Sequence, residues 1–146
     1  MYPTLQMLHS LLAFAVLILL IVAVLNAVMG YIRQSDFSPR DFKLTLWALI
    51  ATHTQVLLGL VLYFISPLGM KSFSSNGAQV MKDAGLRLFA VEHISVMIIA
   101  AVLLTIGYAK QKRTEDSATK FKHISIFYAI ALLLILSRIP WAIWLA

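Results

Sequence analysis

The sequence predicts an all-α integral membrane protein, a four-helix up-and-down bundle with both chain termini on the outer side of the bilayer. Of its 146 residues, 61% are hydrophobic and only 12% are charged, which is too apolar for a soluble fold of this size. Charged residues are absent from 1–32 and from 44–70, and each stretch exceeds the roughly 20 apolar residues that cross a bilayer. Because lipid offers no hydrogen bonds to the backbone, spans of this length are expected to be helices.

We expect four membrane helices in a single domain covering 1–146, at about residues 5–31, 42–66, 86–109 and 122–145. The third segment is interrupted only by Arg87 and Glu92, and the fourth, after its first residue, only by Arg138. The first segment lacks the basic start of a secretion signal, and its apolar run exceeds the usual length of about 7 to 15 residues. It is therefore expected to remain as the first membrane helix.

Basic residues are distributed unequally between the two ends of the predicted bundle. The first and third loops carry Arg33, Arg40, Lys43, Lys110, Lys112, Arg113, Lys120 and Lys122, whereas the opposite end has only Lys71, Lys82 and Arg87. Short loops rich in Lys and Arg stay in the cytoplasm, so both termini should face outward. The net charge of +6 therefore indicates topology and contact with anionic lipid in the bilayer, and it gives no support to nucleic-acid binding.

Local signals define several boundaries. Ser38 and Pro39 provide a capping hydroxyl and a first-turn proline for the second helix. The following loop is long, and its residues 76–83 predict a short amphipathic helix on the outer surface, either as a lid or as a solvated connection. Trp141 and Trp144 fit an aromatic belt at the outer interface.

Each predicted helix carries one histidine, and the chain has no other: His9, His53, His93 and His123. An imidazole in hydrocarbon is costly, so this pattern favours ligands of a metal or cofactor. The absence of cysteine excludes thiolate sites and covalent haem attachment. The four histidines are too widely staggered in depth for one zinc or copper ion.

Depth then indicates which histidines cooperate. His9 and His93 lie about two turns, or ~10 Å, below the outer ends of the first and third helices, which are diagonal partners in an up-and-down bundle. They are candidates to ligate one iron from opposite sides of a haem, with Arg138 or Arg87 near its propionates. The alternative for Arg138 is a buried ion pair with Glu92.

His53 and His123 lie on the other diagonal and would serve a second haem nearer the cytoplasm. Their depths agree only if the fourth helix begins near Ser117. Two alternatives stay open: His123 is an ordinary interfacial histidine, or His53 pairs with His93 and leaves His9 at the surface.

Several short motifs resemble those of a known group of proteins. They are His53–Gln55, Leu58–Pro67, Val91–His93 with Met97–Ala100, and Ile139–Trp141. These strings resemble small bacterial four-helix membrane proteins labelled cytochrome B, over nearly the whole chain. The resemblance implies a b-type haem protein of the bacterial cytoplasmic membrane, with His9, His53 and His93 as the matching histidines.

Two functions of different classes follow. The first is an electron carrier that holds one or two noncovalent b haems and exchanges electrons with quinone or with subunits of a respiratory complex. The second is a cofactor-free accessory subunit of a larger respiratory or transport complex, in which small-residue faces dock to other helices. Either reading allows a homo-oligomer. Neither predicts a stand-alone enzyme, because the chain offers no nucleophile with a paired base and no phosphate-binding loop.

Overall fold

Four long helices dominate the structure, a computed structural model that describes residues 1–146. They are α1 (Tyr2–Ile32), α2 (Pro39–Ile65), α6 (His93–Lys112) and α7 (Ser117–Arg138). The shorter elements are α3 (Lys71–Asn76), α4 (Gln79–Lys82), α5 (Ala84–Arg87), the π-helical turn η1 (Leu88–Glu92) and α8 (Trp141–Trp144). Four segments are long and apolar enough to cross a membrane, with α5, η1 and α6 forming one of them. The chain is thus all-helical with four candidate membrane spans, as its composition predicts.

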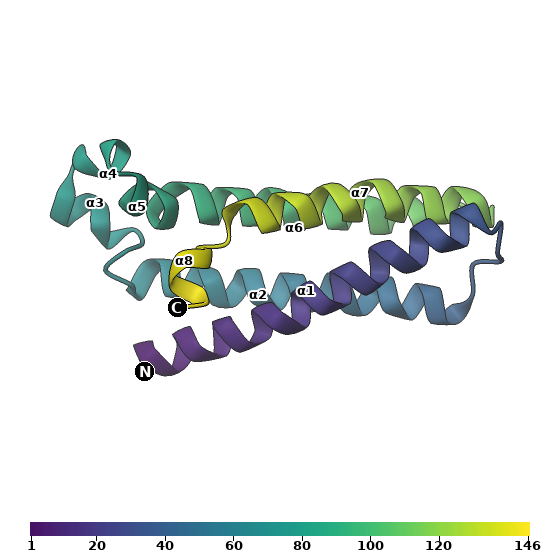
Figure 1. The fold of residues 1–146 in the computed structure, drawn as a ribbon, viewed down its shortest axis with the longest axis horizontal. Helices are drawn as coiled ribbons and strands as arrows, with labels where there is room; N and C mark the ends of the chain where they lie inside the picture. Colours follow the sequence, from purple (N-terminus) through teal and green to yellow (C-terminus); the bar gives the residue numbers. More distant parts are fainter.

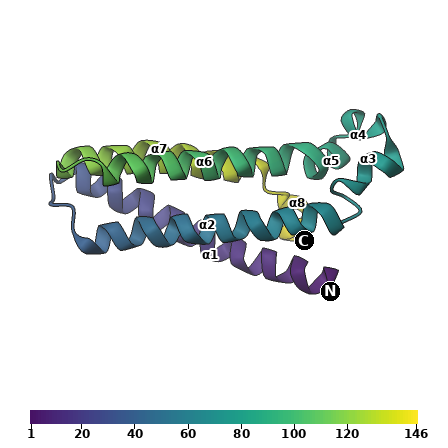
Figure 2. The same ribbon diagram turned by 180° about the vertical axis from the view of Figure 1, so that it is seen from behind.

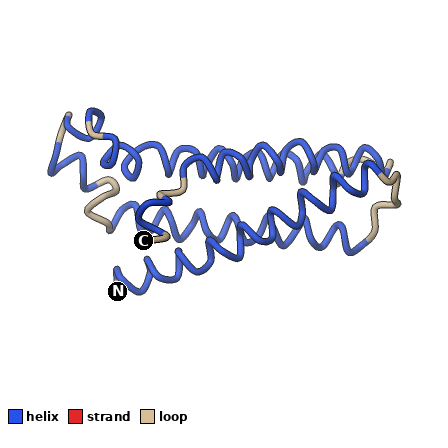
Figure 3. Tube along the Cα trace, viewed as in Figure 1, coloured by secondary structure: helices blue, strands red, loops and turns tan.

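The four long helices form a ring in which α1 contacts α2 and α7, and α6 contacts the same two helices. α1 and α6 are therefore diagonal, as are α2 and α7 (Figures 1 and 2). Both termini lie at one end of the bundle, where α1 diverges from α7 and the short α8 fills the space between them (Figure 1). The connections 33–38 and 113–116 lie together at the other end (Figure 3), joined by the Phe37 amide, which donates to the Ser117 hydroxyl at 2.9 Å.

One face of α1 and one face of α6 are buried in the core. On α1 the residues below His9 are enclosed, with Val16, Leu20, Ala23 and Ala27 at most 3% exposed. On α6 Ala100 and Leu104 have no exposed surface, and they pack against the same core. Gly107 lets the bundle close, because an added Cβ would lie 2.5 Å from Cβ of Phe127. Small residues thus bring the helices together in the half of the bundle remote from the termini.

The predicted bounds of the fourth helix, 122–145, are wrong at both ends. The helix begins at Ser117 because Asp116 caps it, accepting from the Thr119 amide at 3.0 Å. This bond and one from the Thr119 hydroxyl lower the pKa of Asp116. The helix ends at Arg138 because Pro140 has no N–H and disfavours a helical Ile139, whose ψ is 134°. The chain then turns back as α8.

The long connection after α2 and the third span also differ from expectation. Residues 76–83 do not form one helix, because Gly77 at φ 53° separates α3 from α4. Neither α3 nor α4 lines the main cavity, so this segment is not a lid over it. The third span is not uniformly α-helical: η1 inserts a π-turn directly before His93, whose amide bonds to the carbonyl of Leu88. Single π-turns are rare and frequently mark functional sites.

Candidate functional site

A cavity of about 310 Å³ lies in the half of the bundle that holds the termini. It is bounded by α1, α2 and α6 and closed by the end of α7 and by α8, where Trp144 packs on Phe14 with ring centres 4.4 Å apart. Its wall is mostly apolar, and its polar members include His9, His93 and Gln55. An apolar cavity with a few convergent polar groups is the usual form of a cofactor or ligand site.

His9 enters this cavity from α1 and lies against Gly59 of α2. A Cβ added at Gly59 would be 3.1 Å from Cε1 of the His9 ring, so a larger residue would crowd the imidazole. One turn away, the Gln55 amide donates to the backbone carbonyl of His9 at 2.8 Å. Nδ1 of His9 is buried and has no hydrogen-bond partner. Gln55 and Gly59 of α2 therefore face protein and bound the space around this histidine.

His93 enters from the opposite side and is oriented by the backbone. Its Nδ1 donates to the carbonyl of Arg138 at 2.8 Å. A carbonyl only accepts, so Nδ1 carries the proton, and the neutral ring has its lone pair on Nε2. The adjoining π-turn is held by Tyr63, whose hydroxyl donates to the carbonyl of Ala90 at 3.1 Å. A histidine whose second nitrogen donates to a carbonyl is the usual arrangement of a metal ligand.

The two imidazoles face one another across the diagonal of the bundle. Their ring centres are 6.4 Å apart and their planes are inclined at 73°. His9 and His93 therefore share one depth and one cavity, as expected from their positions two turns below the helix ends.

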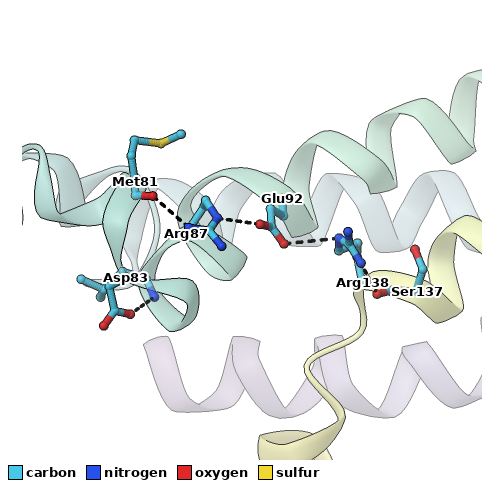
Figure 4. Close-up of polar contacts among 7 residues, drawn as sticks. Met81, Asp83, Arg87, Glu92, Ser137 and Arg138 are labelled. Carbon is cyan, nitrogen blue, oxygen red and sulfur yellow. Dashed lines mark hydrogen bonds and ion pairs between the residues drawn. The ribbon is translucent and has the colours of Figure 1, made fainter.

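The polar layer beside them is an ion-pair triad centred on Glu92 (Figure 4). Oε1 of Glu92 lies 2.8 Å from Nε of Arg87, and Oε2 lies 3.3 Å from Nε of Arg138. The expected pairing of Arg138 with Glu92 is present, but it is not buried, since the two side chains are 43% and 30% exposed. The two arginines also bond to backbone carbonyls of Met81 and Ser137, respectively.

The other two histidines lie outside the cavity. His53 sits between α2 and α6, where Nδ1 bonds to the carbonyl of Leu49 at 2.8 Å and Nε2 lies 3.0 Å from the hydroxyl of Thr105. His123 is half-buried near the first turns of α7. The early start of α7 that their pairing required is present, yet neither histidine lines either of the two principal cavities. The alternative pairing of His53 with His93 is not formed either.

No protein-family model, curated protein or solved structure matches this chain. The resemblance to proteins labelled cytochrome B therefore stays a prediction from the motifs. The structure also has no group of three or more His, Cys, Asp or Glu residues arranged to hold a metal ion. A metal ion in this cavity would have to be held by the two imidazoles and by ligand atoms of a cofactor that carries it, as the iron of a haem is.

Sequence reasoning missed several residues that shape the site. Outside the cavity, sequence reasoning also missed Thr105, whose hydroxyl lies against His53 and is a recognisable signal in a membrane segment. The carbonyl of Arg138 could be anticipated only from Pro140, which ends the helix and leaves that carbonyl without an amide partner. The π-turn before His93 has no sequence signal that we can identify.

Proposed function

We propose that this chain is a membrane b-type haem protein for electron transfer, with one haem held between His9 and His93. The observation that carries the proposal is the pair of imidazoles facing each other across a largely apolar cavity, 6.4 Å between ring centres.

That spacing fits ligation of one iron by both rings. A ring nitrogen lies about 1.2 Å from the centre of its imidazole and binds a metal at about 2.0 Å, so two rings ligating one ion in line have centres about 6.4 Å apart. The same separation and the 73° inclination are also those of an edge-to-face ring pair, so the haem spectrum, and not the spacing, decides between the two. The tautomer imposed on His93 by the carbonyl of Arg138 also leaves Nε2 free to donate a lone pair.

The surroundings suit a noncovalent haem as well. Gly59 keeps the wall beside His9 free of a side chain, and the remaining lining is mostly apolar, which disfavours water and stabilises a macrocycle by burial. Arg87 and Arg138 at the outer edge bring two cations against one carboxylate, which leaves positive charge for a pair of propionates.

When bound, the haem would supply a one-electron iron couple. The chain's own residues would set its properties: His9 and His93 would hold the iron, the apolar wall would provide a low dielectric, and the arginines would set the local charge. His53 and His123 lie elsewhere, so the proposal extends to one haem. Quinone or a respiratory subunit is the expected exchange partner.

The basic loops support the orientation that goes with this function. The two loops rich in Lys and Arg lie at the end of the bundle remote from the termini, so we propose that the termini and the haem cavity lie toward the outer face of a bacterial cytoplasmic membrane. A haem at this depth is placed to exchange electrons with a quinone at the outer interface.

The test is a dithionite-reduced minus oxidised visible spectrum of detergent-purified protein expressed with ample haem, with a pyridine haemochrome assay for stoichiometry. We expect b-type Soret and alpha bands at about one haem per chain, since each four-helix chain has one His9–His93 pair. His9→Ala and His93→Ala should abolish the bands. His53→Ala and His123→Ala are the matched controls and should retain them.

A flat spectrum from folded protein would refute the haem proposal and favour the cofactor-free accessory subunit. The small residues of α1 and α6 would contribute little to such docking, because Ala23, Ala27, Ala100 and Gly107 are already buried within the chain. A partner would have to use the larger apolar side chains on the outer surface.

A further inference from the structure

Glu92 occupies an unusual place beside the proposed haem ligands. It directly precedes His93 and ends the π-turn η1, and its carboxylate joins two residues that are far apart in the sequence, Arg87 and Arg138 (Figure 4). A carboxylate within a candidate membrane span is expected to have a specific role. The contribution of Glu92 is therefore sought in what it positions.

Arg138 is bound at both of its ends by consecutive residues of the third span. Nε of its guanidinium lies 3.3 Å from Oε2 of Glu92. Its backbone carbonyl accepts a hydrogen bond from Nδ1 of His93 at 2.8 Å. The carbonyl is free to accept because α7 ends there, so no amide from a following helical turn reaches it. Since both contacts involve one residue, holding the side chain also restricts the position of the carbonyl.

We infer that Glu92 is a positioning residue: by pairing with Arg138 it holds that residue's carbonyl against His93 and so fixes the tautomer and orientation of the imidazole. This inference rests on the proposed role of His93 as a haem ligand, but the hydrogen bond itself requires no haem. The neighbouring Arg87 contacts the other carboxylate oxygen and makes no contact with Arg138 or His93, so it supplies the matched comparison.

The consequence can be measured in the haem-free protein. In the wild type the ring nitrogen resonances of His93, assigned with a His93→Gln variant and ¹⁵N-histidine labelling in detergent micelles, should report a single Nδ1–H tautomer. Glu92→Gln removes the charge that holds Arg138, and we expect loss of the single-tautomer signature. Arg138→Gln removes the same pair from its other end while retaining the backbone carbonyl, so it should give the same result. The double variant should be no worse than either single one.

Arg87→Gln should keep the wild-type tautomer. It removes an ion pair from the same carboxylate at a shorter distance, so a merely electrostatic or stabilising role of the triad would make it at least as harmful as Glu92→Gln. The inference is overturned if Glu92→Gln keeps the pure Nδ1–H tautomer, or if Arg87→Gln loses it to the same extent. Circular dichroism of each variant checks that the bundle is intact. Arg138→Gln leaves Glu92 paired with Arg87, so we expect it to disturb the fold least.

The outcomes separate this inference from the proposed function. A haem-binding protein whose His93 tautomer ignores Glu92 refutes the positioning role alone. A protein that binds no haem but shows the tautomer change in Glu92→Gln and not in Arg87→Gln refutes the haem proposal and leaves the positioning of His93 by Glu92 established.

Discussion

Gly59→Ala should separate haem binding from folding. The new Cβ would lie 3.1 Å from Cε1 of His9, whereas carbon atoms at optimal separation are about 3.5–4.0 Å apart. The imidazole must therefore retreat by a few tenths of an ångström, which approaches the tolerance of about 0.5 Å within which a ligand constellation works. His9 has little freedom to follow, because its own carbonyl is held by Gln55.

The expected loss is comparable to that of removing a group that orients a metal ligand, which typically costs about 10- to 100-fold in metal affinity, or about 1.4–2.8 kcal/mol. Stability of the haem-free protein should change by less than about 1 kcal/mol, because the gain in helix propensity from Gly to Ala offsets the crowding. The assay is a haem titration of the purified apoprotein, followed by the Soret band, together with its denaturation midpoint.

Gly107→Ala is the matched control for that experiment. Its Cβ would meet Phe127 at 2.5 Å in the core, so overpacking should cost about 1–3 kcal/mol of stability without moving either imidazole. Wild-type haem affinity in Gly59→Ala would refute the assignment of His9 as a ligand seated on Gly59. Equal loss of affinity in both variants would show that affinity merely follows stability.

Three further outcomes are expected. Ser38→Ala removes the cap of α2 and should lower the free energy of unfolding by about 1 kcal/mol, measured by denaturation in mixed micelles; an unchanged midpoint would contradict this. Tyr128→Phe deletes the buried bond from its hydroxyl to the carbonyl of Thr45, 2.8 Å long, and should cost about 0.5–1.5 kcal/mol in the same assay; a stabilised variant would be the contrary result. In the cysteine-free chain, an impermeant maleimide added to intact cells should label Ser74→Cys but not Ser35→Cys, because positive loops stay inside; the reverse pattern would invert the proposed topology.

The fold was predictable because hydropathy and small residues determine it. Charge-free stretches identify the spans, and the residues below His9 on α1 lie on the buried face that a helical projection predicts. The predicted bounds of the fourth helix were wrong because the apolar sequence continues through Ile139 and Pro140 to Trp144. The α-helix itself cannot continue past Arg138. Hydropathy therefore locates a span, and backbone chemistry decides where its helix stops.

The histidines were less predictable than the helices. The depths of His9 and His93 alone predicted that they lie together, because both positions are counted from helix ends at the same end of the predicted bundle. Depth could not exclude a role for His53, whose ring nitrogens are engaged by Leu49 and Thr105. Hydrogen bonds between helices depend on rotation about the helix axis, and the sequence fixes that rotation only through packing of the whole bundle. The π-turn before His93 also changes the rotation of the following helix about its axis.

The two halves of the bundle meet different physical requirements. At the end remote from the termini, Gly107 and the alanines of α1 and α6 allow close packing. At the other end the helices diverge, and the structure relies on directed contacts instead: Gly59 against His9, and the carbonyl of Arg138 against His93. Changes at well-separated sites are generally additive. Substitutions in the packed half should therefore alter stability with little effect on the imidazole pair, and substitutions around the pair should alter its geometry with little effect on stability, which is the separation that the two glycine variants measure.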